Sequence, residues 1–201
     1  MSLVDVAMVG HLGPEALAAT GMGGMLAWGA LSIVLGIRTS VQTITSRRLG
    51  QKKPKECINA LNNGFLLASI YSIPISLLGW TYGYLIIPLF INDSITTPIA
   101  ISYFSISSIG IFFNALSFVF QGFYTGIEKT KIHLSVTITS NIINAYLNAG
   151  FIYGKAKLGY LFDSQTNNFF DLSNFWFWAD FEGMGVTGAA IGTLISSIWM
   201  M

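Results

Sequence analysis

The sequence predicts an all-α membrane protein, a polytopic bundle of about six transmembrane helices in which the first helix is partial. Hydrophobic residues make up 53% of the 201 residues and charged residues only 9%, compared with roughly 25% charged residues in soluble domains. The mean hydropathy is accordingly high, at +0.62. Long charge-free stretches separate the charged residues, and a stretch of about 20 apolar residues can cross a hydrocarbon core about 30 Å thick.

Six stretches are the expected membrane segments of a single transmembrane lobe over residues 1–201. They cover approximately residues 1–10 (partial), 16–46, 58–87, 99–126, 133–153 and 184–201. The first has about seven apolar residues before the breakers Gly10 to Pro14, too few to span a bilayer. It is therefore either an interfacial piece or the end of a helix whose first half lies outside the sequence, and we favour the second.

The later boundaries follow from helix start and stop signals. Pro14 and Glu15 favour a helix N-terminus for the second segment, and the charged run 47–56 separates it from the third. Pro88 favours the end of the third segment, whereas Pro74 inside it is tolerated in a membrane when neighbours satisfy the freed carbonyl. The sixth segment has no basic residue at its end, so we expect a chain truncated at both ends.

The positive residues of the connections alternate between two sides. Loops 47–56 and 127–131 contain seven Lys or Arg residues, whereas the connections on the other side contain Lys155 and Lys157. Because Lys and Arg near helix ends are retained in the cytoplasm, the sequence predicts that loops 47–56 and 127–131 are cytoplasmic. We expect a multi-pass protein of the cell membrane, which in a bacterium is the inner membrane.

The one long connection, residues 155–183, is predicted to be an external loop rich in aromatic residues. Trp and Phe are typical anchors at the membrane–water interface, and we favour that interpretation over an aromatic cage that grips a ligand. The residues concerned are Phe169, Phe170, Phe175, Trp176, Phe177 and Trp178.

Composition and motifs argue against several functional classes. A net charge of +1, with no basic patch outside short loops, argues against a nucleic-acid partner. One cysteine, Cys57, and two histidines, His11 and His133, provide no internal disulfide and no zinc cluster. The sequence has no phosphate-binding loop and no H-E-x-x-H motif, so we expect neither an enzyme nor a cofactor. If the protein moves a solute, an ion gradient is the natural source of energy.

Polar side chains recur at helical spacing within two of the expected segments. They are Thr137, Asn141, Asn144 and Asn148 in the fifth segment, and Asn114, Ser117, Gln121 and Thr125 in the fourth. Spacings of three and four residues place each set on one helix face. Such a stripe either joins helices through hydrogen bonds, worth roughly 0.6–2 kcal/mol per contact, or lines a hydrated cavity for a cation or substrate. The spacing leaves both interpretations open.

Asp5 and Arg38 are the acidic and basic residues that fall inside the expected segments. Because a charge in hydrocarbon is costly, each is a functional candidate by default. The alternative for Arg38 is snorkelling toward the cytoplasmic surface, and for Asp5 it is solvation beside a chain terminus. In the sixth segment, Gly188 and Gly192 are predicted packing positions, since small residues four apart let helices approach closely.

Four short motifs resemble the amino-terminal lobe of MATE (multidrug and toxic compound extrusion) transporters. They are Val4-Asp-Val-Ala-Met-Val-Gly-His-Leu-Gly13 followed by Ala16-Leu-Ala-Ala19, Thr45-Ser-Arg-Arg-Leu-Gly50, Asn144-Ala-Tyr-Leu-Asn148, and Gly183-Met-Gly-Val-Thr-Gly-Ala-Ala-Ile-Gly-Thr193. Their order matches the family, and the resemblance covers nearly the whole chain. The resemblance implies one lobe of a two-lobe MATE-like fold with six helices in each lobe. The loop 155–183 departs from it, because the family usually has a shorter connection there.

The resemblance also implies a function and a set of site residues. Such a protein is a secondary active transporter, an antiporter that exports an organic cation or drug in exchange for a proton or sodium ion. Carried over by motif, Asp5 matches the coupling acid, and Asn144 and Asn148 match a pair of residues near it. Thr193 matches a hydroxyl of the sixth helix. The further candidates for lining the cavity are Arg38, Asn114, Gln121 and Asn141.

Two other functions compete with this one at the level of sequence. A lipid-linked saccharide flippase of related fold should line its cavity with several basic residues, and only Arg38 is available. A non-transporting channel or scaffold would use the polar stripes to line a pore or to hold helices together. Besides the lipid bilayer and a small-molecule substrate, the expected partner is a missing second lobe or a second copy in a homodimer.

Overall fold

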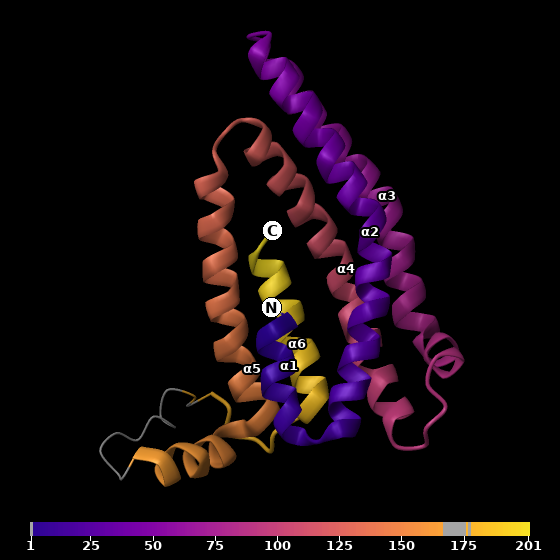
Figure 1. Cartoon of the computed structure of the whole chain (residues 1–201), viewed down its shortest axis with the longest axis vertical. Coiled ribbons are helices and arrows are strands. Elements are labelled where there is room, and N and C mark those ends of the chain that lie inside the picture. Colours follow the sequence, from indigo (N-terminus) through magenta and orange to yellow (C-terminus); the bar gives the residue numbers. More distant parts are fainter. Residues whose placement is uncertain (1, 167–175, 177) are drawn as a thin grey trace.

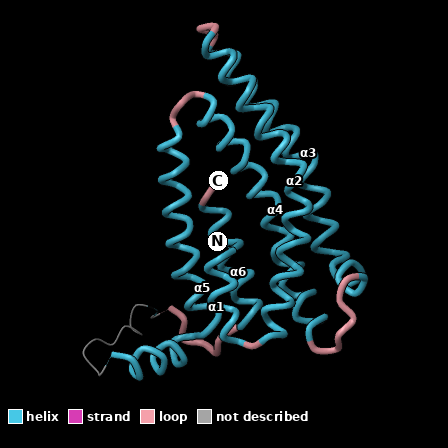
Figure 2. Tube along the Cα trace, viewed as in Figure 1, coloured by secondary structure: helices cyan, strands magenta, loops and turns pink. Residues whose placement is uncertain are grey.

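The computed structural model describes residues 2–166, 176 and 178–201 of the chain, and this part is built from helices joined by short connections (Figures 1 and 2). The elements in chain order are α1 (Ser2–Val9), η1 (Gly10–Leu12), α2 (Pro14–Gly50), α3 (Pro54–Ile86), η2 (Ile87–Leu89), α4 (Thr96–Gly126), α5 (Thr130–Thr166) and α6 (Gly185–Trp199). The elements η1 and η2 are single 3₁₀ turns.

Most helices extend a few residues beyond the expected membrane segments, because they end at backbone signals rather than at the first charged residue. Pro14 and Pro54 occupy the first turns of α2 and α3, where a missing N–H leaves no hydrogen bond unmade. Before α4, the Asp93 carboxylate accepts hydrogen bonds from the backbone N–H and the hydroxyl of Thr96. These bonds hold the pKa of Asp93 below its usual value.

The connection expected at 155–183 is helical as far as Thr166, which corrects the predicted extent of that loop. At Gly154 the backbone has φ 69° and ψ 163°, a left-handed φ that glycine adopts without a steric penalty. The chain changes direction there, and in Figure 1 the continuation of α5 runs sideways, away from the lower end of the bundle. The backbone of Gly154 is non-helical, so α5 consists of two helical segments that meet at a kink.

The aromatic residues expected as interface anchors fall into two sets. Phe169, Phe170, Phe175 and Phe177 lie outside the described residues. Trp176 and Trp178 pack back onto α5, where each indole N–H donates a 2.8 Å hydrogen bond to Tyr146, the first to its carbonyl oxygen and the second to its hydroxyl. In the described part of the chain, these two side chains therefore fasten the segment before α6 to α5.

Helix α4 stands at the centre of the bundle. It packs extensively against α2 and α3 on one side and against α6 on the other, while α1, α5 and α6 pack together (Figure 1). Two main apolar clusters fill these contacts. One joins α2, α3 and α4 and includes Val34, Ala68 and Ala115; the other joins α1, α2, α4, α5 and α6 and includes Val9 and Ala189.

The outward faces of the helices are apolar, as expected for a multi-pass membrane protein. In the described part of the chain, α2, residues Pro54–Leu89 and α4 are long and apolar enough to cross a membrane, and α6 is a shorter apolar helix. Large hydrophobic side chains such as Ile70 and Trp80 of α3 remain more than half exposed. Lipid tails are the environment that such faces require.

The two turns that carry most of the positive charge lie at the same end of the bundle. In Figure 1 the α2–α3 turn and the α4–α5 turn are both at the top, whereas η1 and the continuation of α5 are at the bottom. This arrangement fits the alternation of charge in the sequence. Which side of the membrane this end faces stays a prediction.

Glycines let α5 and α6 approach closely. A Cβ atom built on Gly188 would overlap the backbone of Phe151, and one built on Gly192 would overlap the Asn148 side chain. The two backbones are therefore in direct contact along this face of α6, which is the packing that small residues four apart permit.

We expect Gly188→Val to lower the free energy of unfolding by about 1–3 kcal/mol, because the added side chain must push α6 away from the Phe151 backbone. Thermal unfolding of the purified protein in detergent measures the change. Gly36→Ala is the matched control: a Cβ there meets no atom within 4 Å, so its unfolding temperature should match or exceed that of the unmodified protein. Equal stability of both variants would contradict the close packing.

Candidate functional site

Four residues far apart in the sequence meet in one hydrogen-bonded cluster. Asp5 of α1 is 5% exposed, and its Oδ1 accepts a hydrogen bond from Asn148 Nδ2 of α5 at 2.5 Å. Its Oδ2 accepts one from the Thr193 hydroxyl of α6 at 3.2 Å. Asn144 Nδ2, one turn before Asn148, donates to the same Thr193 hydroxyl at 3.2 Å. Three helices thus contribute to what we call the Asp5 cluster: Asp5, Asn144, Asn148 and Thr193.

The carboxylate determines how the side chains around it are oriented. An ionised carboxylate only accepts hydrogen bonds, so Asn148 presents its NH₂ group to Asp5 and turns its carbonyl oxygen away. In the described part of the chain, the Oδ1 atoms of Asn144 and Asn148 are buried without a hydrogen-bond partner. Both asparagines are fully buried, and unpaired buried oxygens are rare enough to require an explanation.

Gly192 makes room for this orientation. A Cβ built on Gly192 would overlap Asn148 Oδ1, so any larger residue at this position would displace the amide that binds Asp5. Helix α1 is held in place by a second contact, in which the Tyr153 hydroxyl donates to the Met8 carbonyl at 2.6 Å. The short first helix is therefore fixed to α5 by both its acidic side chain and its backbone.

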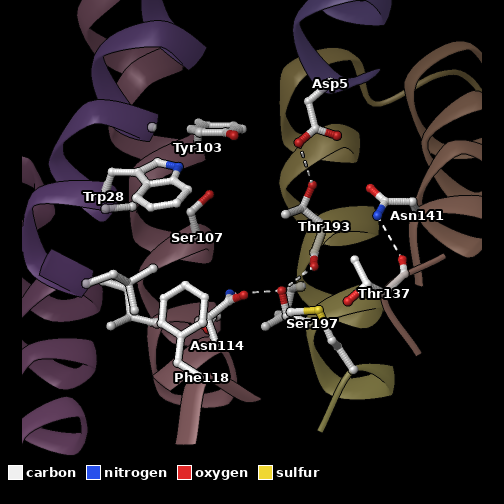
Figure 3. Close-up of a pocket in the computed structure, with 17 residues that line it drawn as sticks. Asp5, Trp28, Tyr103, Ser107, Asn114, Phe118, Thr137, Asn141, Thr193 and Ser197 are labelled. Atoms are coloured by element: carbon white, nitrogen blue, oxygen red, sulfur yellow. Dashed lines mark hydrogen bonds between the residues drawn. The ribbon is translucent and has the colours of Figure 1, made fainter. Parts of the chain in front are cut away.

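The Asp5 cluster borders a cavity of about 270 Å³ inside the bundle (Figure 3). Residues of α2 and α4 line one wall, and residues of α5 and α6 line the other. Trp28, Tyr103 and Phe118 supply aromatic surface, and Asp5 lies at one end. The wall thus combines apolar rings with hydroxyl and amide groups and one carboxylate, as small-molecule sites commonly do.

The structure separates the four predicted cavity-lining residues into two pairs. Asn114 and Asn141 line the cavity, whereas Arg38 and Gln121 are not among its lining residues. Asn114 donates to the Ser197 hydroxyl at 3.0 Å, and Asn141 donates to the Thr137 carbonyl at 2.8 Å. Asn114 and Gln121 belong to the same polar stripe of α4, and only Asn114 borders the cavity, which a spacing rule on one helix cannot show.

The aromatic wall is the part of the site that the sequence reasoning missed. Trp28 and Tyr103 sit in apolar stretches, where an aromatic residue is ordinarily read as packing or as lipid contact. The feature of the sequence that could have indicated this wall is a pair of glycines on α2. Gly24 lines the same cavity, and Gly23 lies against the Tyr103 ring. A run of small residues on α2 therefore leaves space beside the aromatic rings.

The Asp5 cluster offers oxygen ligands for a cation or a site for a proton. Its groups are a carboxylate, two amide oxygens and a hydroxyl, the ligand types that hard cations prefer. Among the described residues, no group of three or more His, Cys, Asp or Glu side chains is placed to hold a metal ion. Oxygen groups of these kinds suit a hard cation or a proton better than a soft transition-metal ion.

A buried carboxylate beside a cavity within a membrane helix bundle is typical of membrane transporters. Comparison with known families gives the same class, because the MatE family model matches residues 1–149. The chain belongs to the MATE family, whose members are transporters and not enzymes.

Curated relatives cover the same region. The probable multidrug resistance protein NorM of Bacillus subtilis is 27% identical over 155 residues, which is 77% of this chain and 34% of that protein. The protein of the same name from Photorhabdus laumondii is 31% identical over 160 residues, 79% of this chain and 35% of that protein. The chain thus spans about a third of the length of these relatives.

Solved structures share the fold. A MOP superfamily transporter from Pyrococcus furiosus, described as having reversed polarity in its binding pocket, superimposes with a TM-score of 0.78 at 22% identity. That match covers 99% of this chain and 38% of the other. An inward-facing multidrug resistance MATE transporter gives a TM-score of 0.76 at 23% identity, over 99% of this chain and 39% of the other.

We expect Asn148→Ala to lower the free energy of unfolding by about 1–3 kcal/mol, because it removes a donor from a buried carboxylate. Thermal or denaturant unfolding in detergent measures this change. The same substitution at the exposed Asn62 of α3 is the matched control and should change stability by less than about 0.5 kcal/mol.

A double-mutant cycle separates the Asp5 contact from other effects of Asn148→Ala. If the hydrogen bond carries the effect, Asn148→Ala should destabilise an Asp5→Ala background less than it destabilises the unmodified protein. Additive losses in the two backgrounds would show that Asn148 acts independently of Asp5.

Proposed function

We propose that this chain forms the ion-coupling lobe of a secondary active antiporter that exports organic cations or drugs. The supporting observation is the position of Asp5, which belongs both to the hydrogen-bonded cluster of three helices and to the wall of the cavity. A cation at the cluster and a solute in the cavity would therefore act on the same carboxylate. The names of the NorM relatives support a drug-extrusion role.

Antiport requires only that the two ligands favour different conformations. In this proposal a proton or sodium ion binds Asp5 and neutralises the charge that attracts an organic cation. Binding of the ion also changes the hydrogen bonds that Asp5 accepts from Asn148 and Thr193, and so alters the contact between α1, α5 and α6. Loss of attraction and rearrangement of α1 would then release the solute.

The composition of the cavity supports an organic cation over an anionic headgroup. Within the described part of the chain, its lining includes the Asp5 carboxylate and no Lys or Arg side chain. Trp28 and Tyr103 provide the aromatic faces that attract cations. A flippase for lipid-linked saccharides would need basic residues at these positions, and Arg38 is not among the lining residues.

The proposal includes a second lobe. Because the chain spans about a third of its NorM relatives, we propose that a further six-helix lobe, or a second copy of this chain, completes the translocation path. We also place the protein in the cell membrane, the inner membrane in a bacterium, with loops 47–56 and 127–131 in the cytoplasm.

We expect Asp5→Asn to reduce ion-driven transport at least tenfold, because an amide of the same size neither releases a proton nor neutralises a cation. Uptake of a fluorescent organic cation into everted membrane vesicles measures transport, driven in one arm by a pH gradient and in another by a sodium gradient. The arm that drives the unmodified protein identifies the coupling ion.

Asp93→Asn is the control for the loss of an acidic group. Asp93 is exposed in the connection before α4 and remains able to accept hydrogen bonds from Thr96 as an asparagine. It should leave transport within twofold of the unmodified protein. Unchanged rate and ion dependence in Asp5→Asn would refute the coupling role.

A second substitution tests the aromatic wall. We expect Trp28→Ala to raise the KM for an aromatic organic cation about 5- to 30-fold, which corresponds to about 1–2 kcal/mol for a desolvated cation–π contact. Trp80→Ala removes the same side chain from the exposed face of α3 and should leave the KM unchanged. Similar KM values for both variants would show that Trp28 does not contact the substrate.

A further inference from the structure

The end of the bundle that carries the α2–α3 turn has an excess of positive charge that the described structure does not neutralise. Five basic residues occur within residues 47–55. Glu56 takes up two of them: its carboxylate binds Arg48 Nε at 2.9 Å and Lys53 Nζ at 3.2 Å. Arg47, Lys52 and Lys55 are exposed and form no ion pair within the described part of the chain. We call these three residues the basic tip.

The basic tip stands at the end of the helix hairpin formed by α2 and α3, and it projects beyond the α4–α5 turn (Figure 1). Helix α2 has 37 residues, about 55 Å at 1.5 Å per residue. This length exceeds a hydrocarbon core about 30 Å thick. The helix is therefore long enough for its last turns to reach the headgroup layer of one leaflet.

Exposed apolar side chains continue almost to the basic tip. Ile44 and Leu49 of α2 are 47% and 40% exposed, and Ile58 of α3 is 53% exposed. Apolar side chains directly beside Lys and Arg place this segment at the boundary between hydrocarbon and water. A partner at this boundary has to offer an apolar region and negative charge together, as a phospholipid with an anionic headgroup does.

We propose that the basic tip binds the headgroups of anionic phospholipids in its own leaflet, so that the α2–α3 hairpin is a lipid-recognition surface. Nucleic acid or an acidic protein would match the charge, but neither would account for the exposed Ile44, Leu49 and Ile58. No residue of the basic tip belongs to the Asp5 cluster or to the cavity lining. The proposal therefore does not depend on the transport proposed above. Retention of anionic lipid can therefore fail or succeed independently of ion coupling.

The test is lipid retention measured by native mass spectrometry. The protein is released from micelles that contain equal amounts of phosphatidylglycerol and phosphatidylcholine, and the retained lipids are counted. We expect preferential retention of phosphatidylglycerol by the unmodified protein. Lys52→Gln combined with Lys55→Gln should lower the apparent affinity for phosphatidylglycerol about 25-fold, because each basic residue contributes a factor of about five.

The matched control is Lys155→Gln combined with Lys157→Gln, which removes two lysines from the part of α5 that follows Gly154. It should retain phosphatidylglycerol as the unmodified protein does. Both double variants should keep the unmodified unfolding temperature, which shows that a loss of lipid is not a loss of fold. Higher salt should weaken the preference, since the contacts at the tip are solvent-exposed charges.

Three outcomes would overturn the proposal. The first is equal retention of phosphatidylglycerol by the tip variant and the control, and the second is displacement of the lipid by inorganic phosphate but not by chloride of equal ionic strength. The third is loss of binding to RNA or to an acidic peptide in the tip variant while lipid retention stays unchanged. Adding Arg47→Gln should deepen the effect of the tip variant by a further factor of about five.

Discussion

The burial of the Asp5 carboxylate is the constraint on which the inner arrangement of this lobe depends. A carboxylate within a membrane bundle needs hydrogen-bond donors, and here they come from Asn148 of α5 and Thr193 of α6. To deliver them, α5 and α6 must touch, and glycines at positions 188 and 192 of α6 allow that contact. The position of α1, the close pairing of α5 with α6 and the shape of one cavity end are therefore all linked to one acidic side chain.

The polar residues of α5 form two groups at different positions along the helix. Asn144 and Asn148 belong to the Asp5 cluster, where they hold helices together, whereas Thr137 and Asn141 face the cavity. One part of the stripe thus joins helices, and the other lines a cavity. In the first part, the Oδ1 atoms of Asn144 and Asn148 are buried without a hydrogen-bond partner among the described residues.

Basic, acidic and apolar side chains occupy different parts of the bundle. Basic residues gather at the α2–α3 and α4–α5 turns, at one end (Figure 1). Asp5 is buried between α1, α5 and α6, and the apolar faces of α3 point outward. A basic end, a buried carboxylate and apolar outer faces therefore occupy different parts of the bundle, although only 9% of the residues are charged.

The sequence by itself determined the class of protein, the approximate helices, the placement of charge at alternate turns and the residues that resemble the family motif. These properties are local or additive: hydropathy, helix spacing and breakers such as Pro14 and Pro54 act within one segment. Only the tertiary structure decided that Asp5 meets Asn148 and Thr193, that Arg38 and Gln121 do not line the cavity, and that Trp28 and Tyr103 do. It also decided that α5 continues past Gly154. The physical reason is that the rotation of each helix about its axis, and the distance at which glycines let helices meet, depend on contacts between residues far apart in the chain.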